Sequence, residues 1–350
     1  MNTSTVSRSV QILFLSLFIP ICLNAQDIHF SQFDNVPMHL SPALTGVFNG
    51  DVRFNGNYRS QWHDVPITYR TAYFAVDKKW YTCEKKTNFF GGGAVFFYDW
   101  AGDGNLSTGH LSLNGSYTHR LTHKSYLTAG LQLSGYQRRF DEADLRFDAQ
   151  YTGKEYDPSL PNLENFEDTN IFYGDVGLGL NYHFQHPDGK SRTTFDVGAG
   201  LLHINTPQKS FYDDPDEELP ARLALYGLGT IQLRSKLDLV LRLTGGFQGP
   251  HREYLIGAGI KPHLNLEKTK ELAVLLGLSY RFNRGGFGTG DALIPNAEVH
   301  YKTWRFGLSY DINVSDFDIA TNNFGGPEFS VIYTFKKPVE NFCPTCPTYL

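Results

Sequence analysis

The sequence predicts an all-β fold, a transmembrane antiparallel β-barrel of about 14 strands. Three observations support it: long segments with period-two alternation, connections that alternate in length, and a composition without long apolar runs. With 15% aromatic residues and 34 glycines in 350 residues, the chain is too aromatic and too glycine-rich for disorder. After residue 25 no run of 18 apolar residues occurs, which excludes a helical membrane protein.

Residues 1–25 read as an export signal. Arg8 precedes an apolar run from Val10 to Leu23, and Ala25 provides a small residue at the expected cleavage site. The mature chain is therefore expected to begin at Gln26. The 31 basic and 36 acidic residues also argue against a nucleic-acid partner.

Residues 26–49 form a separate N-terminal segment that precedes the first strand. Asn35-x-Pro37, Ser41-Pro42 and Thr45-Gly46 are typical of turns and break any strand. Phe30, Phe33, Met38 and Leu44 make the segment too apolar to extend freely into water. Two arrangements fit: a plug inside the barrel, or a periplasmic surface that packs against a partner.

Strand patterns recur from residue 50 to residue 336, the predicted barrel. In the clearest, Trp304, Phe306 and Leu308 alternate with Arg305 and Ser309, which gives one apolar and one polar face. About fourteen such segments begin near residues 51, 69, 89, 106, 125, 170, 193, 222, 237, 252, 272, 292, 304 and 328.

The length of these segments favours a membrane barrel over a soluble sandwich or propeller. Most run for ten residues or more, as a tilted strand needs to cross a bilayer, and aromatic residues gather at their ends. A propeller would show a repeat of about 40–50 residues, which is not found. A soluble core would have to bury Asp175, Arg242, Arg281 and Asp311 without partners.

The connections alternate between short and long. Residues 121–124, 185–191, 235–236 and 302–303 are short, whereas residues 141–169, 205–220 and 314–326 are long. Outer-membrane barrels have short periplasmic turns and long external loops. An even strand number then predicts that both termini face the periplasm, including a C-terminal tail over residues 337–350.

Residue patterns for catalysis or cofactor binding are weak, so no enzyme, cofactor or metal site is predicted. His110 with Ser112, or His203 with Asn205, could be drawn into a hydrolase site, but no G-x-S-x-G motif is present. Asp213 and Asp214 belong to an acidic loop that lacks an EF-hand register, and a solvated loop fits better than a cation site.

Three cysteines remain after export: Cys83, Cys343 and Cys346. The Cys343-Pro-Thr-Cys346 spacing is that of a redox or zinc half-site, but it lies in the tail without a second ligand pair. A local disulfide or free thiols are therefore preferred to metal or redox chemistry.

Three motifs in order resemble the PorP/SprF family of the Bacteroidota type IX secretion system. They are a Q-D-x-x-F-S-Q-F opening at residues 26–33, a P-A-L-T-G turn at residues 42–46, and an N-Y-R-x-Q-W first strand at residues 57–62. Together they cover about 37 residues, and the remaining strands would fit other barrels too.

The resemblance implies a non-enzymatic protein of the cell outer membrane that supports export or surface anchoring of specific cargo, such as gliding adhesins. The implied partners are cargo with a C-terminal secretion domain, the channel SprA/Sov, and the periplasmic ring proteins PorK/GldK and PorN/GldN. The alternative is a passive porin or small-molecule transporter. Candidate partner-binding residues come from the motifs, the acidic loop and the tail: Phe30, Phe33, Pro42, Tyr58, Trp62, Asp213, Asp214, Cys343 and Cys346.

Overall fold

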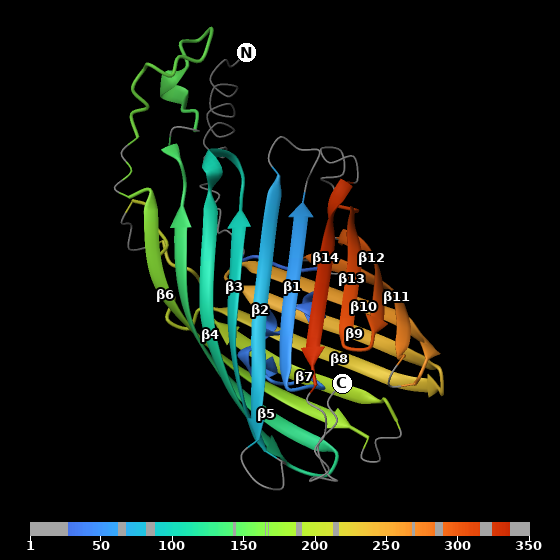
Figure 1. Cartoon of the computed structure of the whole chain (residues 1–350). Helices are drawn as coiled ribbons and strands as arrows, with labels where there is room; N and C mark the ends of the chain where they lie inside the picture. Colours follow the sequence, from blue (N-terminus) through green and yellow to red (C-terminus); the bar gives the residue numbers. More distant parts are fainter. Residues whose placement is uncertain are drawn as a thin grey trace, which may run out of the picture.

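The computed structural model describes residues 27–61, 68–81, 88–142, 145–164, 166, 168–186, 191–212, 217–267, 270–283, 290–315 and 324–336. These residues form a closed antiparallel barrel of 14 strands in sequence order, in which β1 pairs with β14 (Figure 1). The predicted fold class is therefore confirmed. No helix in the described part of the chain is long and apolar enough to cross a membrane.

The strand bounds agree closely with the alternation in the sequence. The strands are β1 (Val52–Gln61), β2 (Tyr69–Tyr81), β3 (Phe89–Trp100), β4 (Ser107–Arg120), β5 (Ser125–Arg139), β6 (Asn170–Gln185), β7 (Thr194–Leu202), β8 (Arg222–Arg234), β9 (Leu237–Gln248), β10 (His251–Asn265), β11 (Leu272–Asn283), β12 (Gly290–Tyr301), β13 (Trp304–Asn313) and β14 (Phe324–Phe335). β14 begins four residues earlier than expected because Gly325 and Gly326 continue the pairing with β13 through a register shift at Asp311.

The two faces of each strand follow the predicted division. Phe306 and Leu308 on β13 are exposed on the outer face, whereas Ser309 and Asp311 are buried inside. An apolar outer face and a polar inner face are the arrangement of a membrane barrel. Hydrophobic side chains therefore face lipid, and the buried interior is unusually polar.

The two ends of the barrel differ in the length of their connections. Turns such as residues 121–124, 235–236 and 302–303 join strands at one end, which we call the short-turn end. The connection from β5 to β6 and the connection from β7 to β8 lie at the opposite, long-loop end. In Figure 1 the green loop after β5 rises above the barrel at this long-loop end.

Candidate functional site: a plugged lumen

The described part of the N-terminal segment, residues 27–49, lies inside the barrel, and we call this segment the plug. It contains η1 (Phe33–Asn35), α2 (Pro37–Leu40) and η2 (Pro42–Leu44). Each proline begins a helical turn, where a missing N–H costs no hydrogen bond, and the Ser41 hydroxyl accepts a bond from Ala43 N. Of the two arrangements that fit the sequence, the structure has the plug.

The plug runs through the lumen from the long-loop end to the short-turn end. Asp27 N donates to Gln248 Oε1, at 3.0 Å, where β9 ends at the long-loop end. At the other end Gly46 N donates to Asp77 Oδ2, at 2.7 Å, and Asp51 N donates to Phe335 O, at 2.9 Å. Asp27 and Phe335 therefore lie at opposite ends of the barrel. The even strand number predicted that both ends of the chain lie on the same side, and the described residues do not follow this prediction.

Apolar plug residues fill two regions of the interior. Phe30, Val36 and Met38 pack against aromatic and aliphatic residues of β2, β3 and β5, and Phe33 and Leu44 pack against β8, β10 and β12. All five are at most 5% exposed. This burial removes apolar surface from water and holds the plug on both sides of the barrel.

Glycines on the inner face let the plug backbone approach the wall. A Cβ at Gly130 of β5 would lie 2.3 Å from Pro42 C, and one at Gly179 of β6 would lie 2.3 Å from Ser41 Oγ. At Gly200 of β7 the distance to Leu40 O would also be 2.3 Å. These positions exclude larger side chains as long as the plug is in place.

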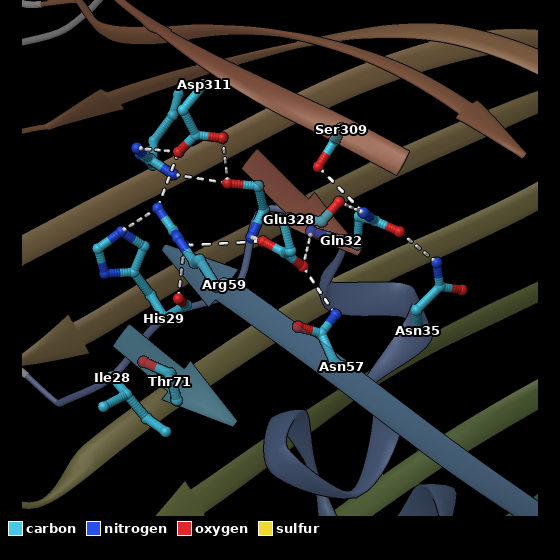
Figure 2. A network of polar contacts seen from close by, with 12 residues as sticks. Ile28, His29, Gln32, Asn35, Asn57, Arg59, Thr71, Ser309, Asp311 and Glu328 are labelled. Carbon is cyan, nitrogen blue, oxygen red and sulfur yellow. Dashed lines mark hydrogen bonds and ion pairs between the residues drawn. The ribbon is translucent and has the colours of Figure 1, made fainter. Parts of the chain in front are cut away.

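Glu328 of β14 binds the plug backbone directly. Its carboxylate accepts hydrogen bonds from Ser31 N, at 2.7 Å, and Gln32 N, at 3.0 Å, and from Asn57 Nδ2 of β1, at 2.9 Å (Figure 2). Glu328 is fully buried, so each bond satisfies an oxygen that water does not reach. One carboxylate therefore joins the plug to the seam between β1 and β14.

A second group of charges surrounds Asp311 of β13. Arg59 Nη2 lies 2.8 Å from Asp311 Oδ2 (Figure 2). Arg281 Nη2 lies 2.8 Å from the same oxygen, and Ser31 Oγ donates to Asp311 Oδ1, at 2.6 Å. Arg59 Nη1 also donates to His29 O in the plug. The pairing stabilises charges that would be costly to bury alone.

A third group lies nearer the short-turn end. Asp34 Oδ2 of the plug lies 3.0 Å from Arg242 Nη2 and 2.7 Å from Arg305 Nη2. Both arginines also bind Glu298 of β12, with 2.8 Å between Arg305 Nε and Glu298 Oε2. This cluster of two carboxylates and two guanidinium groups therefore connects the plug to the barrel wall.

At the long-loop end Asp27 forms ion pairs with residues near the end of β7 and the beginning of β8. Its Oδ2 lies 2.9 Å from Arg222 Nη1 and 3.3 Å from Nε2 of His203, which directly follows β7; His203 Nδ1 lies 3.2 Å from Asp175 Oδ2. Burial disfavours the charged imidazole, but Asp175 and Asp27 outweigh it and raise the pKa of His203 to about 9. Burial opposes ionisation of Asp27, but His203 and Arg222 hold the pKa of this carboxyl well below its usual range.

These shifts predict a pH dependence of stability. The contribution of His203 is complete below its unfolded pKa of about 6.5 and is lost as the pH rises through about 9; that of Asp27 is present above about 4 and lost in acid. Urea unfolding of wild type and His203→Gln in phospholipid vesicles should differ by on the order of 2 kcal/mol at pH 6 and much less at pH 10. A difference that stays constant over this range would contradict the role of the His203 charge.

The candidate residues from the sequence fall in different places. Phe30, Phe33 and Pro42 are buried within the plug, and Tyr58 is 42% exposed on the outer face of β1. A partner could reach the first three only if the plug moved. Trp62, Asp213, Asp214, Cys343 and Cys346 lie outside the described residues, as do Cys83 and the export signal.

The charged groups that hold the plug were not among those candidates. Arg59 lies within the N-Y-R-x-Q-W motif, and the alternation places Arg242, Arg281 and Asp311 on the inner face. Nothing in the alternation shows which carboxylate each arginine meets. Asp34 and Glu328 were missed because neither lies in a recognisable ligand pattern.

The residues that could be drawn into a hydrolase site make packing and hydrogen-bond contacts within the barrel. His110 stacks on Phe97 with ring centroids 4.3 Å apart, and Ser112 Oγ accepts hydrogen bonds from Asn114 and Gln132. His203 is held in the ion pairs described above. Within the described ranges no group of three His, Cys, Asp or Glu side chains could hold a metal ion.

The two longest loops pack on each other at the long-loop end. Phe140 contacts Phe166 of the first loop and Phe211 of the second, with ring centroids 4.8 and 4.7 Å apart. Arg138 lies over the ring of Phe211, at 5.1 Å, and Phe166 contacts Tyr212, at 5.1 Å. These aromatic contacts join the loops into one surface, which we call the loop platform.

Comparison with known protein families assigns the chain to a family. The model of the type IX secretion system membrane protein PorP/SprF matches residues 23–333. The chain belongs to the PorP/SprF family. The resemblance seen in the three motifs is thus confirmed. The chain is a membrane protein of the type IX secretion system, and its fold is a barrel of the outer-membrane type.

Solved structures that are similar to this PorP/SprF barrel are also outer-membrane barrels. The toluene transporter TodX of Pseudomonas putida is 10% identical, with a TM-score of 0.45 over 85% of this chain and 93% of that chain. CdiB from Escherichia coli is 7% identical, with a TM-score of 0.47 over 81% and 63% of the two chains. BamA from Haemophilus ducreyi is 10% identical, with a TM-score of 0.42 over 82% and 70%. A search of curated proteins found no match.

Proposed function

We propose that this protein is a non-enzymatic outer-membrane component of type IX secretion that supports export or surface anchoring of specific cargo, such as gliding adhesins. The observation that carries the proposal is the plugged lumen of a PorP/SprF barrel. A polypeptide cannot cross a lumen that the plug occupies. The barrel therefore acts as a receptor or anchor, and the export channel is a separate protein.

The loop platform is the proposed binding surface for cargo. Long loops are external in outer-membrane barrels, so this end faces the cell surface and the short-turn end faces the periplasm. Leu163 and Tyr151 of the first loop are 83% and 56% exposed. Exposed apolar side chains on a folded loop are a suitable contact for a C-terminal secretion domain.

The same orientation assigns the parts of the chain. Residues 1–25 are a signal peptide, 26–49 the plug and 50–336 the barrel, and 337–350 form a periplasmic tail available to the ring proteins PorK/GldK and PorN/GldN. The channel SprA/Sov would deliver the cargo. Asp27 then lies near the cell surface, so the mature N-terminus is proposed to be external.

A strain without this protein provides the test. It is complemented with the wild type or with a variant in which residues 145–164 are replaced by a short Gly-Ser linker. We expect the variant to assemble in the outer membrane but to leave the cell surface without its cargo. The matched control carries the same linker in the turn at residues 121–124 and should display cargo normally. Normal display in the strain that lacks the protein would overturn the proposal.

The porin alternative makes an opposite prediction in planar bilayers. Purified wild-type protein should give no stable, large conductance because the plug occupies the lumen. An open, stable conductance of the wild type would favour the porin.

A further inference from the structure

A cavity of about 340 Å³ lies inside the barrel at the short-turn end. It is bounded by the end of the plug at Phe48, and residues 302–305 and Lys336 line its mouth. Its remaining walls come from β1 and from the strands β7 to β14, so strands of the barrel surround it. A ligand would therefore enter from the aqueous space at this end.

The lining of the cavity carries more positive than negative charge. Seven lysine and arginine side chains line it, against five carboxylates. Five arginine–carboxylate pairs are internal to the lining: Arg192 pairs with Asp238, at 2.7 Å, and Arg242 and Arg305 each pair with both Asp34 and Glu298. Arg53 binds Asp77 outside the lining, so the charges that remain are three lysines, Lys261, Lys302 and Lys336, against the carboxylates of Asp196 and Glu271. The lysines are therefore in excess.

Lys261 of β10 is the central member of this surplus. It is half-buried and lines the cavity, and within the described ranges its side chain makes no hydrogen bond or ion pair. An ammonium group away from bulk water gains from a negatively charged partner. A negatively charged ligand in the cavity would supply that partner to the Lys261 ammonium group.

We propose that this cavity binds an acidic peptide segment that enters from the short-turn end and places a carboxylate on Lys261. Lys302 and Lys336 at the mouth would meet further negative charges of the same segment. The volume suits a few side chains, and the cations are spread from the interior to the mouth, as an extended ligand requires. In the proposed orientation, the segment belongs to a periplasmic protein.

The test uses the full chain, purified in detergent, and a fluorescent tetraglutamate peptide followed by anisotropy. We expect Lys261→Gln to weaken binding by about tenfold, the loss for one charge-assisted hydrogen bond, and Lys261→Arg to retain most of it. The matched control is Lys124→Gln, an exposed turn lysine at the same end that does not line the cavity. If Lys261→Gln does not give a folded barrel, Lys302→Gln is the second variant, with an expected loss of about threefold.

Three results would overturn the proposal: equal affinity of the Lys261→Gln and Lys124→Gln proteins, equal binding of a tetraglutamine peptide, or complete displacement of the peptide by millimolar inorganic phosphate. The last result would indicate a site for small anions. Binding is measured without cargo, so failure here is distinct from failure of the proposed role in export.

Discussion

Replacing Gly130 with valine is expected to displace the plug and open the lumen. The new Cβ would lie 2.3 Å from Pro42 C and 2.4 Å from Ala43 N, and both are backbone atoms that can move only if η2 moves. Overpacking of this kind costs about 1–3 kcal/mol, which the contacts of η2 with β5 and β6 cannot absorb locally. The measurement is planar-bilayer conductance, which should rise from the closed wild-type level to stable open events.

Gly135→Val is the matched control for this experiment. Gly135 belongs to the same strand but faces outward, and an added Cβ would meet nothing within 4 Å. This variant should remain closed. If Gly130→Val is as closed as Gly135→Val and unfolds at the same urea concentration, the plug does not rest against β5 as described.

Replacing Glu298 with alanine is expected to be the most destabilising single change in the lumen. Glu298 is 2% exposed and binds both Arg242 and Arg305, so its loss leaves two guanidinium groups that share one carboxylate, Asp34, among the described residues. Removing one partner of a buried ion pair costs about 3–5 kcal/mol. Urea unfolding in phospholipid vesicles, followed by tryptophan fluorescence, measures this loss.

Two further variants separate charge from size in that result. Glu267→Ala removes an exposed carboxylate just after β10, at the same end of the barrel, and should change stability by less than about 0.5 kcal/mol. Adding Arg242→Met to Glu298→Ala should recover part of the lost stability, because one unpaired charge is removed. A loss below about 1 kcal/mol for Glu298→Ala alone would contradict the role of the cluster.

In the proposed function, export of cargo depends on the loop platform, whereas closure of the lumen depends on the plug. The loop platform, the proposed cargo surface, is made of residues outside the plug, so the proposed binding of cargo does not require the plug to move. Gly130→Val therefore also separates the two: in cells it should leak small solutes and still display cargo. Loss of display with an intact loop platform would instead indicate that the plug takes part in cargo handling.

The sequence by itself determined the local architecture. Period-two alternation reports which side chains face lipid and which face inward, and the strand starts it predicted at Tyr69, Phe89 and Trp304 are those observed. Loop parity identified the two ends. These features depend on neighbouring residues, so they can be read from short windows of sequence.

Only the tertiary structure decided the path of the plug and the pairing of the inner charges. An inward arginine needs a carboxylate, but alternation does not say which one: Arg242 meets Glu298, 56 residues away, and Arg305 meets Asp34, 271 residues away. Closure of β1 on β14 brings these groups to one depth in the lumen, together with the plug. Contacts of such long range depend on the curvature and register of the whole barrel, which no local pattern encodes.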